Sequence, residues 1–176
     1  MERESAVDQR IRVQFGPLSA DDSEPRTAQV PANLLPATPT VLVVDDEHAI
    51  RDFLRAALEV EGYNVLVAED GLHALSLCEC YWVDVILLDL MMPRLDGVGF
   101  LHRFRHRSRP DMASIYIMSA VRTAMEQASA AGVAGAFIKP FDLDELLDAI
   151  AVEVQRRRQA MAIEETAVPL EHVEPA

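Results

Sequence analysis

The fold is decided by the stretch Val83-Asp84-Val85-Ile86-Leu87-Leu88-Asp89-Leu90-Met91-Met92-Pro93-Arg94-Leu95-Asp96-Gly97. The branched apolar run 85–88 is too short for an independent helix and is typical of a strand buried on both faces. The run stops at Asp89. A loop must follow, because proline lacks an amide donor and restricts the residue before it. Asp89 is therefore predicted at the carboxyl end of a buried strand.

Similar short apolar runs recur along the chain, and segments with helical spacing of apolar residues separate them. The predicted strands are residues 41–44, 65–67, 85–88, 115–118 and 136–138, and the predicted helices are residues 50–58, 72–80, 97–106, an alanine-rich run to 131, and a last helix from about residue 142, with its buried stripe reaching 154. Alternating helices and apolar strands predict the α/β class, with helices on both faces of a parallel sheet. We expect a doubly wound, flavodoxin-like sheet in the order 2-1-3-4-5.

The flanking segments differ from this pattern. Residues 1–39 mix charges with several prolines, which predicts a flexible amino-terminal arm. We expect the domain itself to span residues 40–158. Residues 159–176 carry Glu164, Glu165, Glu171 and Glu174 and are predicted to form an acidic tail with no room for an output domain.

Charge and hydropathy narrow the classes of function. The 176 residues carry a formal net charge of −13, which disfavours a nucleic-acid binder, because such proteins need a basic face. The apolar runs are far shorter than the ~20 residues that span a bilayer, and no signal-like segment follows the charged amino terminus. We expect a cytoplasmic protein that binds neither nucleic acid nor membrane.

Polar side chains follow four of the predicted strands: Asp45 with Asp46, then Asp89, Ser119 and Lys139. Right-handed crossovers bring the carboxyl ends of parallel strands to one edge, where ligands bind in open α/β sheets. Three converging carboxylates repel one another unless a cation lies among them, and Mg²⁺ prefers such oxygen ligands. The ammonium and the hydroxyl suit phosphoryl oxygens. The set predicts a site that forms an aspartyl phosphate.

Each of these residues also has a simpler structural explanation. Asp45 and Asp46 would suit the positive end of the following helix, and Ser119 would suit a helix N-cap. Lys139 could be an ordinary loop residue, yet it is the single lysine beside fifteen arginines. We judge that the combination at four strand ends outweighs the separate explanations.

The ordered motifs are specific as a set: Val43-Val44-Asp45-Asp46-Glu47, Leu88-Asp89-Leu90-Met91-Met92-Pro93 with Asp96-Gly97, Met118-Ser119-Ala120, and Ile138-Lys139-Pro140-Phe141. Over about residues 40–156 the chain strongly resembles the receiver domain of bacterial two-component response regulators, of the stand-alone, CheY-like kind. The resemblance implies that Asp89 accepts a phosphoryl group from a phosphohistidine on a sensor histidine kinase or phosphotransfer protein. An unknown downstream protein would then respond.

The resemblance also implies roles for the neighbours of Asp89. Asp46, Asp89 and the backbone carbonyl of Met91 would bind Mg²⁺, with Asp45 acting mainly through a metal-bound water. Lys139 would contact the phosphoryl group, and Ser119 would move to engage it. A homodimer would use the face formed by the fourth helix, fifth strand and fifth helix.

One position departs from the family pattern. The aromatic residue expected three residues before Lys139 is replaced by Ala136, and Phe137 should point to the opposite face of its strand. We hypothesise that a signal leaves through the loop after Ser119 and the following helix. The resemblance also implies that Met91 and Val121 flank the site; both are apolar and cannot hold an attacking water by hydrogen bonds, which predicts slow loss of the phosphoryl group.

Two other classes of function remain open. One is an interaction module that keeps the fold without control by phosphate; the complete acidic set argues against it, and Ala136 favours it. The other is a phosphohydrolase similar to the haloacid-dehalogenase enzymes, which need an acid two residues after the nucleophile. That position is Met91 here.

Three further features are interpreted as structural. Cys78 and Cys80 should point to different faces of one helix and act as small apolar residues. His102 and His106 lie among arginines, which disfavours a metal and predicts a solvated face. Arg156–Arg158 are expected at the negative carboxyl end of the last helix.

Overall fold

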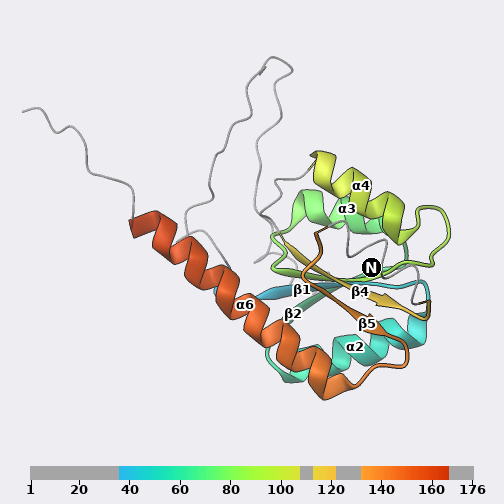
Figure 1. Ribbon diagram of the computed structural model, residues 1–176, viewed down its shortest axis with the longest axis horizontal. Coiled ribbons are helices and arrows are strands. Elements are labelled where there is room, and N and C mark those ends of the chain that lie inside the picture. Colours follow the sequence, from blue (N-terminus) through green and yellow to red (C-terminus); the bar gives the residue numbers. More distant parts are fainter. Residues whose placement is uncertain (1–35, 108–112, 122–131, 167–176) are drawn as a thin grey trace, which may run out of the picture.

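A parallel sheet of five strands forms the centre of the protein (Figure 1). The structure is a computed structural model that describes residues 36–107, 113–121 and 132–166, with side chains described up to residue 161. The strands are β1 (Thr40–Val44), β2 (Asn64–Ala68), β3 (Val85–Asp89), β4 (Ser114–Ser119) and β5 (Gly135–Ile138). They are ordered β2-β1-β3-β4-β5 and all pair in parallel, which confirms the predicted fold class and strand order.

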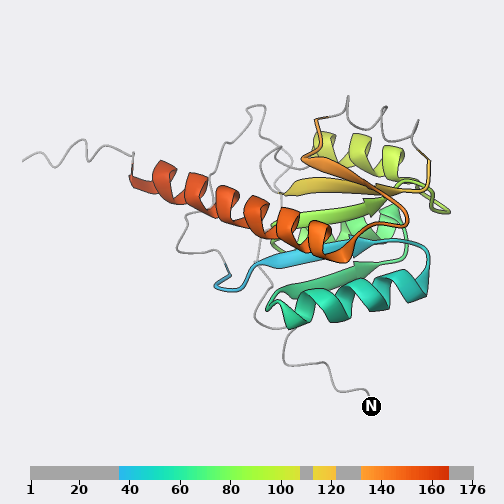
Figure 2. The ribbon, with the colours of Figure 1, turned by 60° about the horizontal axis from the view of Figure 1, so that its bottom comes forward.

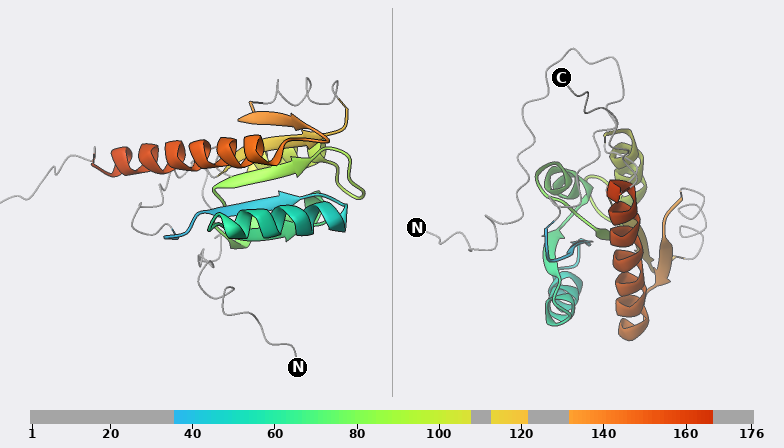
Figure 3. Two further views of the ribbon diagram at one scale, coloured as in Figure 1. Left: turned by 90° about the horizontal axis from the view of Figure 1, so that it is seen from below. Right: turned by 90° about the vertical axis from the view of Figure 1, so that its left-hand side faces the viewer.

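Helices cover both faces of the sheet. Helices α2 (His48–Val60) and α6 (Leu143–Thr166) lie on one face, and α3 (Gly71–Cys80) and α4 (Gly97–Arg107) lie on the other (Figures 1 and 3). Successive strand residues point to opposite faces. In β1, Leu42 and Val44 pack with the α3–α4 core, whereas Val41 and Val43 pack with the α2–α6 core. The continuous apolar runs are therefore explained by two cores.

Strand β3 is buried along its whole length between β1 and β4. The side chains of residues 85–88 have no exposed surface, and Asp89 pairs in register with Met118 of β4. Gly97 donates its amide to the carbonyl of Leu90 at 3.1 Å, which closes the loop between β3 and α4. Asp89 thus lies at the carboxyl end of a central strand, as the sequence predicts.

Apart from the end of the last helix, the elements predicted from spacing agree with the structure where it describes them. The predicted alanine-rich helix up to Ala131 lies outside the described residues. Cys78 is buried and Cys80 half-buried on α3, while His102 and His106 are both exposed on α4. The solvated histidine face is therefore confirmed. Among the helices that the structure describes, none has the length and apolar character needed to cross a bilayer.

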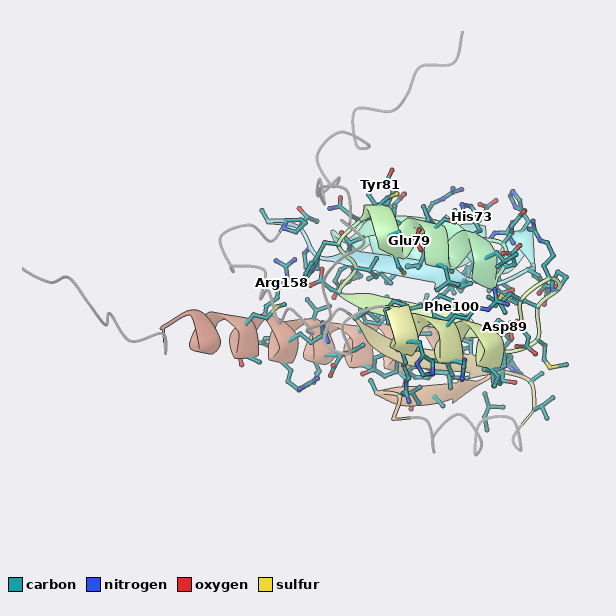
Figure 4. The ribbon with its side chains drawn as sticks, turned by 90° about the horizontal axis from the view of Figure 1, so that it is seen from above. His73, Glu79, Tyr81, Asp89, Phe100 and Arg158 are labelled. Carbon is teal, nitrogen blue, oxygen red and sulfur yellow. The ribbon has the colours of Figure 1, made fainter. Side chains whose placement is uncertain are left out.

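The interpretation of Arg156–Arg158 as the end of the last helix is wrong. Helix α6 continues to Thr166 and extends past the amino ends of the strands (Figure 2). Arg158 donates to both carboxylate oxygens of Asp84, each at 3.3 Å, and to the carbonyl of Pro36 at 2.9 Å. Arg158 therefore anchors the middle of α6 to the chain just before β1 and β3, at the end of the sheet opposite Asp89 (Figure 4).

A second polar cluster holds α6 against the start of β4. The carboxylate of Glu153, 7% exposed, accepts hydrogen bonds from Arg156 Nε at 2.9 Å and Nη2 at 2.6 Å. The hydroxyl of Ser114, the first residue of β4, also donates to Glu153. The hydrogen bonds from Arg156 hold the pKa of Glu153 below its ordinary value, although burial acts in the opposite direction. The ionised carboxylate is therefore the form that the fold stabilises.

We expect Glu153→Gln to lower the free energy of unfolding by roughly 1–2 kcal/mol at neutral pH, because charge-assisted hydrogen bonds are lost. A pKa lowered by folding adds stability above the ordinary Glu value of about 4.3, and this contribution disappears as the pH falls through the folded-state pKa. The difference between the variant and the native protein should therefore shrink as the pH falls below about 4.

Urea unfolding at several pH values measures this difference. Asp148→Asn is the matched control, because Asp148 is an exposed acid on the same helix. If the difference in unfolding free energy between Glu153→Gln and the native protein stayed constant with pH, the ionised carboxylate of Glu153 would not be the stabilising group.

Candidate phosphorylation site

Three carboxylates meet at the carboxyl edge of the sheet. Asp45 and Asp46 follow β1, and Asp89 ends β3, the neighbouring strand. One carboxylate oxygen from each of the three lies within 4.8 Å of the others. Asp45 is fully buried and Asp89 is 5% exposed, whereas Asp46 is open to solvent. The structure thus brings together the three acids that the sequence predicted.

Lys139 connects two of these acids. Its Nζ donates to Asp45 Oδ2 at 2.7 Å and to Asp89 Oδ2 at 2.6 Å (the region of Asp89 is visible in Figure 4). Lys139 directly follows β5, and its amide donates to the carbonyl of Ser119 at the end of β4, at 3.0 Å. The lysine therefore reaches from one side of the sheet to the acids at its centre.

Main-chain amides bind the remaining oxygens of the two buried acids. Asp45 Oδ1 accepts from the amide of Glu47 at 2.9 Å, and Asp89 Oδ1 accepts from the amide of Met91 at 3.0 Å. Each carboxylate thus has one oxygen on its own loop and one on the shared ammonium. Because rotation would break one of these bonds, both carboxyl planes are held in place.

The charges of this group depend on one another. Burial raises the pKa of Asp45 above its ordinary value, and the hydrogen bond from Lys139 only partly offsets this. Burial acts to lower the pKa of Lys139, yet the bonds to Asp45 and Asp89 outweigh it, so that this pKa lies above its ordinary value. The lysine is therefore held in its charged form beside the acids.

Ser119 ends β4 with no exposed surface. Its hydroxyl oxygen accepts a hydrogen bond from the amide of Val121 at 3.1 Å, a local bond between side chain and backbone that is typical of serine turns. Ser119 pairs in register with Ile138, the residue before Lys139. The structure thus places Ser119 at the same edge as the acids, with its hydroxyl engaged by its own loop.

The side chains of β5 are arranged as the sequence predicts. Ala136 packs against the α3–α4 core, and Phe137 belongs to the α2–α6 core, where its ring lies 5.7 Å from that of Tyr116. The aromatic ring is therefore on the opposite face of β5 from residue 136.

Three residues support the site without having been predicted. Gly97 lies so close to β3 that a Cβ atom would be 2.4 Å from the carbonyl oxygen of Asp89. Arg94 forms ion pairs with Glu69 and with the buried Asp70, joining the loop after β3 to the loop after β2. Arg51 Nη1 donates to two carbonyls of the loop after β1. Only the Asp96-Gly97 motif carried a signal in the sequence.

The donor set fits a magnesium ion. Magnesium binds a few carboxylate or carbonyl oxygens and keeps several waters. The cluster offers one exposed and two buried carboxylates, and it contains neither histidine nor cysteine, which softer metals prefer. Asp46 provides an open side for a hydrated cation.

Comparison with known proteins decides the family. The model of the response regulator receiver domain matches residues 41–151, more than half of the chain. This chain belongs to the response regulator receiver domain family. Its members serve two-component signalling, and the predicted receiver domain is therefore confirmed.

Related receivers support this assignment. The response regulator MprA of Mycobacterium bovis is 36% identical over 130 residues, which are 73% of this chain and 56% of that protein. MprA of a Mycobacterium species is 40% identical over 109 residues, 61% of this chain and 46% of that protein. The chain thus spans about half the length of these curated relatives.

Solved receiver structures have the same architecture. The receiver domain of the Francisella response regulator 1452 superposes with a TM-score of 0.63 at 33% identity, covering 68% of this chain and 98% of that one. The response regulator TrrA of Thermotoga maritima, solved in complex with Mg²⁺–BeF, gives a TM-score of 0.60 at 30% identity, covering 66% of this chain and 99% of that one.

We expect Gly97→Ala to destabilise this receiver by roughly 1–3 kcal/mol, because the added methyl group meets the backbone of Asp89 and Leu90, which cannot move without disturbing β3. This cost exceeds the gain of up to about 1 kcal/mol from alanine's helix propensity. Val98→Ala is the control, since Val98 is 50% exposed on the same turn. Thermal and urea unfolding measure both variants, and equal stability of Gly97→Ala and the native protein would refute the close contact.

Proposed function

We propose that this receiver accepts a phosphoryl group on Asp89 and transmits a signal through protein–protein contacts. The observation that carries the proposal is the Lys139 ammonium, which bridges the buried carboxylates of Asp89 and Asp45. A structural ion pair needs only one acid, whereas a phosphoryl group needs both a nucleophile and a cation for its oxygens.

The proposed donor is a phosphohistidine of a sensor histidine kinase or phosphotransfer protein. A carboxylate oxygen of Asp89 forms a bond to phosphorus while the bond from phosphorus to the histidine nitrogen breaks, and the nitrogen keeps that electron pair. Lys139 can then turn from a carboxylate oxygen to a phosphoryl oxygen. Ser119 would exchange its bond to the Val121 amide for a bond to the phosphoryl group.

A magnesium ion would be held by Asp45, Asp46, Asp89 and the carbonyl of Met91. It would supply positive charge for the phosphoryl oxygens during transfer. TrrA, solved with Mg²⁺–BeF, is a related receiver with that cation. Burial raises the pKa of Asp45, and more positive charge beside this carboxylate would favour its ionised form, which supports a cation here.

The residues that would transmit phosphorylation to a partner differ here from the family pattern. Ala136 leaves no aromatic ring on its face of β5. We therefore propose that the signal leaves through the loop after Ser119. We propose further that self-association, where it occurs, uses the face formed by β5 and α6. The helix predicted before β5, the third part of that face, lies outside the described residues. The alternative function, which Ala136 favours, is an interaction module that does not depend on phosphate.

We also propose that the protein acts in the cytoplasm and binds neither nucleic acid nor membrane.

We expect the full chain, incubated with MgCl₂ and acetyl phosphate, to gain 80 Da in intact-mass spectrometry, the mass of one phosphoryl group. Asp89→Ala should remove this adduct, because the nucleophile is lost. Asp144→Asn, which changes an exposed acid on α6, should keep it. An adduct that persists in Asp89→Ala would refute Asp89 as the acceptor, and transfer from candidate kinases would identify the donor.

We also expect the phosphoryl group to persist for minutes or longer. Met91, 65% exposed, and Val121, 43% exposed, flank the site and offer no hydrogen bond to an attacking water. Met91→Gln supplies an amide and should shorten the lifetime, whereas Met91→Leu should not. Loss of the 80 Da adduct over time measures the rate, and a lifetime of seconds in the native protein would contradict this expectation.

A further inference from the structure

We propose that Arg51 is a positioning residue for the magnesium site, acting on the main chain of the loop that carries Asp45 and Asp46. Its Nη1 donates to the carbonyl oxygen of Asp45 at 2.6 Å and to that of Asp46 at 2.8 Å. A single nitrogen thus joins two consecutive peptide groups whose side chains belong to the acidic cluster. This role rests on the magnesium site of the proposed function.

The amide of Glu47 and the ammonium of Lys139 hold the side chain of Asp45, but the main-chain carbonyls of the loop after β1 have little support besides Arg51. The amide of Asp45 still bonds to Ala68 of β2 at 3.2 Å, and the first bond of α2 runs from the Arg51 amide to the carbonyl of Glu47 at 3.1 Å. The carbonyls of Asp45 and Asp46 fall between these two systems. Glu47, the N-cap of α2, makes no side-chain cap. Arg51 therefore supplies the bonds that neither the sheet nor the helix provides.

The position of Arg51 is unfavourable for helix stability alone. It lies in the first turn of α2, where the helix macrodipole disfavours a positive charge. Arg55, one turn later, pairs with Asp52 at 2.6 Å, which is the common exposed arrangement on a helix. Arg51 turns instead toward the loop and is half-buried there. Its contacts with the two carbonyls account for this placement.

A positioning role and a purely electrostatic role of Arg51 predict opposite effects of its removal on the affinity for magnesium. A positive charge near the cluster repels a divalent cation, so that removing the Arg51 charge would tighten binding if charge were all that mattered. If Arg51 instead holds the loop, its removal loosens the main chain that carries Asp45 and Asp46, and magnesium binding must then order that main chain again. Losing an outer partner of metal ligands typically weakens affinity about 10–100-fold.

The test is the dissociation constant of MgCl₂ with the full, unphosphorylated chain, measured by isothermal titration calorimetry. Arg51→Met keeps an apolar stem and removes the donors, and we expect about tenfold weaker binding. Arg51→Lys should recover part of the loss, because one nitrogen makes both bonds in the native protein. Arg55→Met removes an equal charge from the same helix and should leave the dissociation constant within about twofold.

Circular dichroism and urea unfolding without magnesium establish that each variant is folded; if Arg51→Met is not, Arg51→Gln replaces it. Unchanged or tighter magnesium binding by the neutral variant would overturn the positioning role. An equal loss of magnesium affinity in Arg51→Lys and Arg51→Met would also overturn it. No magnesium binding by the native protein would overturn the metal site itself and this role with it. Phosphorylation of Asp89 is scored separately by mass, so that failure of either proposal is recognised by itself.

Discussion

The contact on which the site depends is the ammonium of Lys139 between the carboxylates of Asp45 and Asp89. Two buried acids so close together would repel each other and resist ionisation without a cation. Lys139 holds them in place at 2.7 and 2.6 Å. The sheet makes this contact possible, since β1, β3 and β5 must end at one edge for the three side chains to meet.

A parallel sheet with buried strands explains why this arrangement is precise. The apolar faces of β1 and β3 fill two cores, which leaves the strand ends as the place where polar side chains can be used. The loops that follow are then held from outside, by Arg51 after β1 and by Arg94 after β3. The fold thus provides a rigid base, and the arginines restrict the segments that leave it.

Much of this could be predicted from the sequence, because its signals are local. An apolar run that ends in an acid, as at Leu88-Asp89, identifies both a strand and its useful end. The anchoring of α6 was not predictable, because it rests on a contact between Arg158 and Asp84, which are far apart in the chain. The role of Arg51 was hidden for a related reason: it acts on carbonyl groups, which every residue has.

The pairing of Arg158 with Asp84 also fixes the end of β3 that lies opposite the site. Asp84 immediately precedes this strand and Asp89 ends it, so one straight segment has a fixed carboxylate at each end. Five residues of strand span about 17 Å and cannot stretch, because the backbone is already extended. In mechanical terms β3 is an inextensible link between its two ends. A shift of Asp89 along the strand axis would therefore strain the hydrogen bonds of β3 to β1 and β4 and also the salt bridge that anchors α6.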